Sequence, residues 1–123
     1  MNIFITGGAG YIGSKLVKIL LDKNLKVTIF DQLLFGGDHL LHFNSYKNFK
    51  FIKGDIRDKE SLNRAGLKES DFIIHLASIV GYPACRLNPD LARTTNIIGT
   101  KNILELTSKS QNLIYASTGS NYG

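Results

Sequence analysis

The fold is decided by the stretch Asn2-Ile3-Phe4-Ile5-Thr6-Gly7-Gly8-Ala9-Gly10-Tyr11-Ile12-Gly13. Its residues 3–5 are apolar, which is typical of a strand buried on both faces. Four glycines follow within positions 7–13, and the next residues carry apolar side chains at helical spacing: Ile12, Leu16, Val17, Ile19 and Leu20. Strand, glycine-rich turn and helix in this order are the context in which such a turn binds a phosphate group.

Three of these glycines have distinct expected roles. Gly7 lets the chain leave the strand in a tight turn, Gly10 keeps side-chain atoms away where backbone N–H groups approach a pyrophosphate, and Gly13 lets the helix pack close to the sheet. The helix N-terminus offers unpaired N–H groups and the positive end of its dipole to the anion. The spacing is G-x-x-G-x-x-G rather than G-x-G-x-x-G, so a purely structural turn is the alternative. The flanking strand and helix favour nucleotide binding.

The composition predicts one small domain covering residues 1–123. Its hydrophobic content of 43% suffices for a single core, and it lacks both the apolar run of a membrane-spanning helix and the basic leader of a secretory signal. The single cysteine, Cys85, rules out an internal disulfide and is typical of a reducing cytoplasm. The formal charge of +5 is scattered along the chain, which indicates a solvated surface and argues against nucleic acid as a partner.

A second predicted strand, residues 25–30, ends at Asp31. Asp31 lies 18 residues after Gly13, close to where an acidic residue accepts hydrogen bonds from the adenosine ribose of a dinucleotide. An acid there repels a 2′-phosphate, and no Lys or Arg lies between Asp31 and Lys47, so NAD is favoured over NADP as the cofactor. Gln32, the next residue, is a further candidate for contact with the cofactor. The alternative is that Asp31 only closes the strand as a turn residue.

Residues 32–48 are expected to form a loop with a short helix. His39 and His42 have i, i+3 spacing, but no cluster of Cys, Asp or Glu completes a metal site, so we predict no metal. Asp38 is expected to cap the helix.

The remaining pattern alternates strands and helices. We expect strands at 49–54, 71–78 and 113–117, a helix at about 59–65 that ends near Gly66, a loop at 79–87, and a long helix from Asn88-Pro89 to about Ser110. Right-handed crossovers then give an α/β fold, a Rossmann-type doubly wound parallel sheet with strand order 3-2-1-4-5. Ligands bind at the carboxyl ends of such strands, where the glycine-rich turn, Asp31, Asp55 and residues 77–80 would form one site.

The sequence resembles a known family, the extended short-chain dehydrogenases, and specifically the NAD-dependent sugar epimerases and dehydratases. The resemblance covers the whole chain and depends on motifs in a specific order and spacing. These motifs are Thr6-Gly7-Gly8-Ala9-Gly10-Tyr11-Ile12-Gly13, Asp31, Gly54-Asp55-Ile56-Arg57-Asp58, His75-Leu76-Ala77-Ser78, Asn96, and Ser117-Thr118 ahead of Tyr122-Gly123.

The resemblance implies where a bound NAD would lie. Tyr11 and Ile12 would contact the pyrophosphate, Asp31 the adenosine ribose, and Asp55 and Ile56 would flank the adenine.

The resemblance also implies a nicotinamide side and a substrate. The nicotinamide side would be lined by Leu76, Ala77, Ser78 and Val80, with Asn96 facing it from the long helix. Thr118 would be a catalytic residue that hydrogen-bonds the sugar hydroxyl being oxidised, and the substrate would be a nucleotide sugar.

The sequence departs from the family at the general base. The family uses a Tyr-x-x-x-Lys pair, in which the lysine and the positively charged cofactor ring lower the pKa of the tyrosine. That pair would follow the end of this sequence. Two literal matches, Tyr11…Lys15 and Tyr46…Lys50, overlap the phosphate turn and precede the third strand, so neither is expected to act. The sequence looks like the first third of an enzyme, truncated after the fifth strand and without the C-terminal substrate domain.

Four polar residues near these motifs have structural explanations. His75 lies inside an apolar strand, where a buried histidine with satisfied hydrogen bonds is expected, and Cys85 is expected to pack rather than to act as a nucleophile. Arg57 and Asp58 are expected to form a turn with Asp55 that contains one ion pair.

Three hypotheses for the function stay open. The chain is the NAD-binding part of a nucleotide-sugar epimerase or dehydratase, a stand-alone dinucleotide-binding module (a sensor or a subunit partner) without catalysis, or a folded relic that binds nothing. Because the fifth strand would be an unpaired sheet edge and the long helix would lack a neighbour, we also expect an exposed apolar face and a homo-oligomer.

Overall fold

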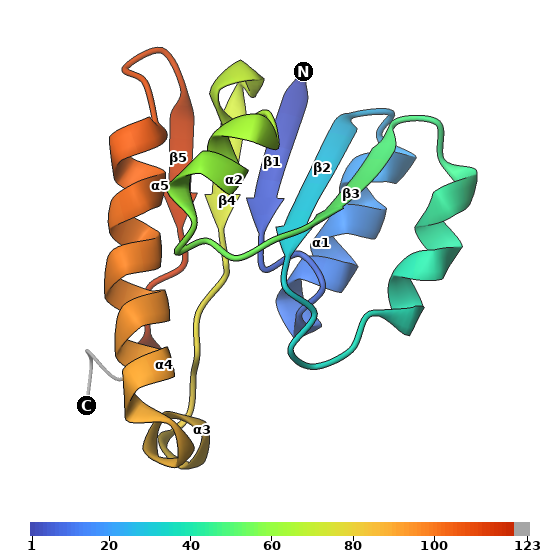
Figure 1. Cartoon of the computed structure of the whole chain (residues 1–123). Helices are drawn as coiled ribbons and strands as arrows, with labels where there is room; N and C mark the ends of the chain where they lie inside the picture. The colour runs from blue at the N-terminus through green and yellow to red at the C-terminus, as the bar shows by residue number, and fades with distance from the viewer. Residues whose placement is uncertain (120–123) are drawn as a thin grey trace.

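The computed structural model of the chain describes residues 1–119. Five strands form one sheet in the order β3-β2-β1-β4-β5, and every neighbouring pair is parallel (Figure 1). The strands are β1 (Asn2–Thr6), β2 (Lys26–Asp31), β3 (Phe49–Lys53), β4 (Phe72–His75) and β5 (Asn112–Tyr115). The predicted Rossmann-type order is therefore confirmed.

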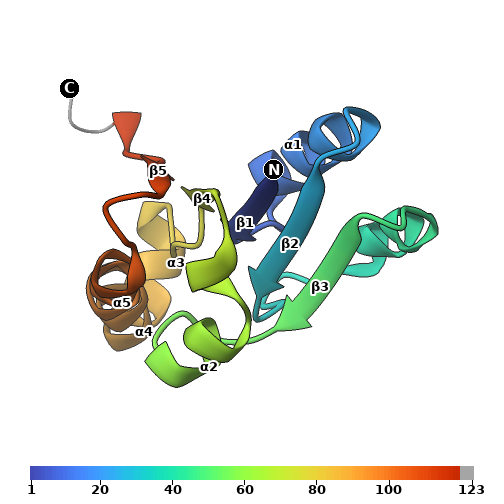
Figure 2. The ribbon, with the colours of Figure 1, turned by 90° about the horizontal axis from the view of Figure 1, so that it is seen from above.

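Helices cover both faces of this sheet (Figure 2). On one face lie α1 (Tyr11–Asp22) and the 3₁₀ helix η1 (Asp38–Ser45). On the other lie α2 (Lys59–Arg64) and a continuous rod of three segments, α4 (Pro89–Arg93), the π-helical η3 (Thr94–Gly99) and α5 (Thr100–Leu106). Two short helices, η2 (Leu67–Glu69) and α3 (Tyr82–Leu87), complete the described part. Within residues 1–119, no helix is long and apolar enough to cross a membrane.

The two layers of core follow from the alternation of side chains along β1. Ile3 and Ile5 point to one face, where they pack in a cluster with Val17 of α1. Phe4 points to the opposite face and packs in a second cluster with Ile103 of α5. All five side chains are at most 5% exposed, which explains why β1 consists of consecutive apolar residues.

Two helix starts and one helix end follow the chemistry of the sequence. The Asn88 side chain accepts a hydrogen bond from the Leu91 N–H at 3.0 Å, with Pro89 as the first residue of α4. The Asp58 side chain caps α2 in the same way. Gly66 follows α2 with a φ of +91°, which is the left-handed conformation expected of a glycine after a helix.

Three predicted strands end earlier in the structure, and the smallest difference is in β3, which ends at Lys53 rather than Gly54. β4 ends at His75 rather than Ser78, because its partner β1 ends at Thr6 and turns away at Gly7. β5 in turn ends at Tyr115, the residue paired with His75, rather than at Ser117.

Three helix predictions were wrong in detail. The expected loop at 79–87 contains α3, because Pro83 lies in the first turn, where its missing N–H costs nothing. The long helix ends at Leu106 rather than Ser110, since Thr107 is already extended. Asp38 is not the cap of η1: the N-cap is Gly37, and no side chain among the described residues caps this helix.

Candidate functional site

The predicted site residues lie at or beyond the carboxyl ends of the parallel strands, which form the lower edge of the sheet in Figure 1. The glycine-rich turn (residues 7–10) leaves β1 there, and Asp31 ends β2. The Asp55 turn follows β3, and the segment that begins at Leu76 follows β4. The doubly wound topology thus brings four separate motifs to one edge.

At two glycines of the motif an added side chain would collide with the backbone. Gly7 has a φ of +71°, and a Cβ there would lie 2.5 Å from the Ala77 backbone nitrogen. A Cβ at Gly13 would lie 2.6 Å from the Cα of Gly8 and 2.7 Å from the Gly7 carbonyl oxygen. Gly13 was predicted to let the helix approach the sheet; the structure shows that its close contact is with the turn itself.

The first turn of α1 begins with backbone N–H groups that have no partner in the helical ladder. Its first intrahelical hydrogen bond runs from the Ser14 N–H to the Gly10 carbonyl at 2.9 Å, so the N–H groups of residues 11–13 precede the helical ladder. No side chain among the described residues caps this end, and its first turn carries no acid. Tyr11 is 88% exposed and Ile12 is 62% exposed, so the turn is open to solvent. These features fit a dinucleotide pyrophosphate.

Asp31 serves the turn and keeps the capacity to bind a ligand. Its Oδ2 accepts a hydrogen bond from the Ala9 N–H at 3.0 Å, and its Oδ1 accepts one from the Leu33 N–H at 2.8 Å. Both interpretations of Asp31 are therefore compatible with the structure. Each carboxylate oxygen has a second lone pair, which leaves acceptor positions for ribose hydroxyls. Gln32 follows it, half-buried.

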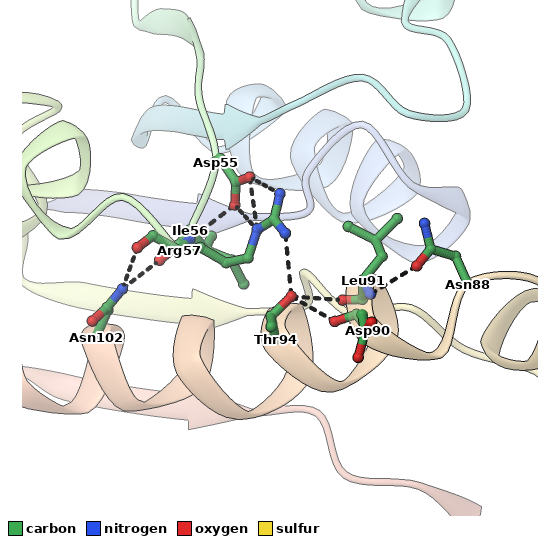
Figure 3. A network of polar contacts seen from close by, with 8 residues as sticks. All are labelled: Asp55, Ile56, Arg57, Asn88, Asp90, Leu91, Thr94 and Asn102. Carbon is green, nitrogen blue, oxygen red and sulfur yellow. Dashed lines mark hydrogen bonds and ion pairs between the residues drawn. The ribbon is translucent and has the colours of Figure 1, made fainter.

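The turn after β3 exposes two groups that a ligand could contact, the Asp55 side chain and the backbone of Ile56. The Ile56 side chain is 3% exposed and packs where a Cβ on Gly99 would be, so only its backbone is available to a ligand. Asp55 forms the predicted ion pair with Arg57 (Figure 3). Burial alone would raise the pKa of Asp55, but the hydrogen bonds and charge of Arg57 outweigh it and lower that pKa.

The segment after β4 is held by Asn96, which lies in the π-helical η3. The Asn96 Oδ1 accepts a hydrogen bond from the Ile79 N–H at 2.8 Å, and its Nδ2 donates to the Ile79 carbonyl at 2.9 Å. Leu76 and Ala77 are half-buried, whereas Ser78 and Val80 are exposed. Asn96 thus acts on the predicted nicotinamide side by fixing its backbone. π-helical turns are frequent at functional sites.

His75 is a buried structural residue, as predicted. Its Nδ1 lies 2.6 Å from the Thr6 hydroxyl and its Nε2 lies 2.9 Å from the Thr100 hydroxyl, so both ring nitrogens have partners. Burial lowers the pKa of His75 to about 4, which keeps the ring neutral. Cys85 is half-buried and its Sγ lies 3.5 Å from the Ile79 carbonyl, consistent with a packing role.

The two literal tyrosine–lysine matches do not resemble a general base. Tyr11 lies in the first turn of α1. Tyr46 precedes β3 and donates a hydrogen bond to Asp22 at 2.8 Å, which raises the pKa of Tyr46, whereas a base requires a lowered pKa. Thr118 is exposed beyond β5, and Tyr122 lies outside the described residues.

Three features of the site were missed by sequence analysis. A Cβ on Gly8 would lie 2.8 Å from the Ile29 side chain, so this fourth glycine of the motif is also required for packing. Arg57 reaches across to Thr94 on the long helix. Thr95 is 2% exposed, and its hydroxyl has no hydrogen-bond partner within the described part of the chain. Only Gly8 carried a signal in the sequence, because it belongs to the glycine-rich turn.

Comparison with known proteins gives relatives across the whole chain. The family model described as "NAD dependent epimerase/dehydratase family" matches residues 3–123. The uncharacterized membrane protein MJ1061 of Methanocaldococcus jannaschii is 44% identical over 85% of this chain and 32% of its own length. The CDP-paratose 2-epimerase of Salmonella typhi is 36% identical over 100% of this chain and 38% of its own length.

Solved structures agree with these sequence relatives. The UDP-glucose 4-epimerase of Thermus thermophilus, solved in complex with NAD, superposes with a TM-score of 0.83 at 34% identity. The match covers 97% of this chain and 38% of that one, so the chain spans about a third of the length of the relatives that it matches. The chain belongs to the NAD dependent epimerase/dehydratase family.

Proposed function

We propose that this chain binds NAD as the cofactor-binding part of a nucleotide-sugar epimerase or dehydratase. The observation that carries the proposal is the open, uncapped first turn of α1, which lies directly on the glycine-rich turn and next to Asp31. Two relatives support it: the Thermus epimerase was solved with NAD, and the Salmonella protein is named a CDP-paratose 2-epimerase.

The proposed binding mode assigns each part of NAD to one segment. The pyrophosphate accepts hydrogen bonds from the backbone of residues 10–13, where Tyr11 and Ile12 lie, and the adenosine ribose donates to Asp31. The adenine lies against Asp55 and the Ile56 backbone. The nicotinamide side is formed by Leu76, Ala77, Ser78 and Val80, on a segment that Asn96 holds in place.

The proposed chemistry concerns a hydroxyl group of the sugar. NAD, when bound, supplies a hydride acceptor for that carbon. Thr118, beyond β5 at the same edge, is proposed to hydrogen-bond the hydroxyl oxygen and orient it. The base that takes the hydroxyl proton is proposed to come from outside the described residues, because Tyr11 and Tyr46 are unsuited to that role.

The direct test is a calorimetric titration of NAD into the chain and into Gly10→Ala. Gly10 has a φ of −76°, which alanine can adopt, and a Cβ there would meet only the Gly7 carbonyl oxygen, at 3.2 Å, so alanine fits once that backbone shifts by a few tenths of an ångström. The methyl group would project where the pyrophosphate approaches. We expect micromolar binding by the wild type and at least about tenfold weaker binding by Gly10→Ala, with little change in Tm.

The matched control is Gly119→Ala, since a Cβ at Gly119 meets no atom within 4 Å. It should bind NAD as the wild type does. Equal affinity of all three proteins would show that the glycine-rich turn does not hold the pyrophosphate. No binding by a folded wild type would refute NAD binding by this chain.

We also propose that the chain self-associates through exposed apolar side chains of the long helix and through the edge of β5. On the long helix Ile97 is 60% exposed and Leu104 is 57% exposed, and on β5 Ile114 and Tyr115 are more than half exposed. Within the described residues β5 is the edge strand of the sheet, so its outer backbone groups are available for pairing. A second copy of the chain would cover both features.

A further inference from the structure

A hollow of about 560 Å³ opens at the amino ends of β1, β2 and β3, which form the upper edge of the sheet in Figure 1. The glycine-rich turn, Asp31 and the Asp55 turn lie at the opposite edge of the sheet. Within residues 1–119, none of the predicted cofactor residues lines the hollow. Its volume is in the range of about 300–1,000 Å³ that is typical of cavities for small molecules.

The parallel register brings basic side chains of the hollow to one face of the sheet. Lys26 is paired with Asn2 across β2 and β1, and Lys50 is paired with Thr28 across β3 and β2. Side chains two positions apart on a strand point to the same face, so Lys26, Thr28 and Lys50 share a face. It is also the face of Phe4, because Phe4 is paired with Thr28. On this face β2 and β3 extend beyond α2 and the long helix (Figure 2).

Three lysines line the hollow, and their charges have no partner in the described part of the chain. Lys26 and Lys50 belong to strands, and Lys47 lies just ahead of β3. All three are exposed. No carboxylate oxygen of residues 1–119 lies within 4.0 Å of their ammonium groups, and the described lining of the hollow includes no Asp or Glu.

The neighbouring acids do not neutralise these lysines. Asp71 lies next to the hollow, but its Oδ2 accepts a hydrogen bond from the Asn2 backbone N–H at 2.7 Å. Glu69 lines a smaller adjoining hollow of about 160 Å³ that it shares with Lys50, and the two form no ion pair. The positive charges therefore face the solvent together, which attracts an anion to this edge.

Amide side chains add neutral hydrogen-bond donors to the same hollow. Asn2 and Asn24 line it, and neither side chain has a hydrogen-bond partner among residues 1–119. Asn48 is held in place, since its Nδ2 donates to the Leu25 carbonyl at 2.6 Å. Ammonium and amide N–H groups are donors that phosphate oxygens accept, and lysine binds phosphate as a point charge.

The spacing of the charges favours a chain of phosphate groups over a single carboxylate. Lys26 and Lys50 lie on adjacent strands, which are about 4.8 Å apart, and Lys47 extends the basic surface ahead of β3. One carboxylate does not span these positions, whereas two or three linked phosphates do.

We propose that this hollow is an anion site, separate from the proposed pyrophosphate site, that binds a small molecule with a di- or triphosphate group through Lys26, Lys47 and Lys50. The inference does not depend on NAD binding, because the two sites lie at opposite edges of the sheet. The simpler explanation is that the three lysines are an ordinary solvated surface. Phosphate compounds would then bind there no better than at other exposed lysines.

The test is a calorimetric titration of tripolyphosphate and of orthophosphate, without NAD, into the wild type and two double variants. Lys26→Gln with Lys50→Gln removes two charges from the hollow. Lys68→Gln with Lys109→Gln is the matched control, because both lysines are exposed, lie outside the lining and form no ion pair within residues 1–119.

We expect tripolyphosphate to bind the wild type at least about tenfold more tightly than orthophosphate does. The variant of the hollow should lose at least about tenfold in affinity for tripolyphosphate, and the control less than about threefold. ATP, titrated in parallel, distinguishes the sources of the phosphate group. Tighter binding of ATP than of tripolyphosphate would support a nucleotide, and equal binding would support recognition of the phosphate chain alone.

An NMR titration of the ¹⁵N-labelled wild type locates the bound tripolyphosphate and does not depend on the folding of any variant. The backbone amide signals of residues 24–28 and 47–50 should shift. Shifts confined to residues 8–13 would place the anion at the glycine-rich turn and overturn the inference. Equal losses of affinity in the two double variants, or no binding of tripolyphosphate by the folded wild type, would also overturn it.

Discussion

Mild acid should destabilise this fold through His75. The ring is 2% exposed and lies between the hydroxyls of Thr6 and Thr100, and burial lowers its pKa from 6.5 to about 4. Below pH 6.5 the unfolded chain therefore binds a proton that the folded chain does not. Stability is fully present above pH 6.5 and is lost as the pH falls toward 4.

The size of the loss follows from the difference in pKa. Each pH unit between the two pKa values costs about 1.4 kcal/mol, so the free energy of unfolding should fall by about 2 kcal/mol between pH 7 and pH 5. Two carboxylates do not contribute in this window: hydrogen bonds from Lys18 and Lys59 lower the pKa values of Asp22 and Glu105, which then titrate at lower pH. The loss is a large share of the 5–15 kcal/mol typical of a domain.

The assay is urea unfolding at pH 7 and pH 5. The variant His75→Gln should be less stable at pH 7 and should lose little more at pH 5, because it has no ring to protonate. The double variant of the exposed histidines, His39→Gln with His42→Gln, should retain the wild-type drop. NMR titration of the His75 ring in the folded wild type gives an independent measure. A drop of about 2 kcal/mol that persists in His75→Gln would refute the reasoning.

Four further predictions concern the turn, the helix, the cofactor and assembly. Gly13→Ala should cost about 1–3 kcal/mol in urea unfolding, because its Cβ would lie 2.6–2.7 Å from backbone atoms of the glycine-rich turn; an unchanged midpoint would contradict that contact. Thr95→Val should raise the free energy of unfolding by about 1 kcal/mol or more, since it removes a buried hydroxyl that has no hydrogen-bond partner among the described residues. If the variant is less stable than the wild type, the hydroxyl does form a hydrogen bond in the folded protein. In calorimetry the wild type should bind NAD more tightly than NADP, and Asp31→Asn should reduce this difference in affinity because it removes the negative charge that repels a 2′-phosphate. If the variant keeps the full difference, the selectivity does not come from Asp31. Ile97→Glu with Leu104→Glu should reduce self-association in light scattering, whereas a wild type that stays monomeric at all concentrations would exclude it.

The strand order was predictable because local signals agree with the global topology. Apolar runs rich in β-branched residues marked the strands, and one glycine-rich turn between a strand and a helix fixed the starting point. The ends of β4 and β5 were not predictable, because each strand stops where its neighbour stops pairing, and this depends on the whole sheet. The helix α3 was missed because Gly81 and Pro83 are typical of loops, although proline is also tolerated in a first helical turn.

The sequence was enough to predict which motifs meet at the site, but not which hydrogen bonds their residues form there. Asp31, Asp55 and the glycines could be placed at one edge of the sheet, because parallel strands align their carboxyl ends. The second role of Asp31, which ties the glycine-rich turn to β2, depends on a hydrogen bond across 22 residues. The link from Arg57 to Thr94 spans 37 residues and has no periodic signature in the sequence.

The central claim is that the open first turn of α1 receives the pyrophosphate of NAD, and an NMR titration of the ¹⁵N-labelled chain tests it most directly. If the claim is correct, NAD shifts the backbone amide signals of residues 8–13 most strongly, followed by those around Asp31 and Ile56. Shifts confined to another surface, or none at saturating NAD in a folded sample, would contradict it.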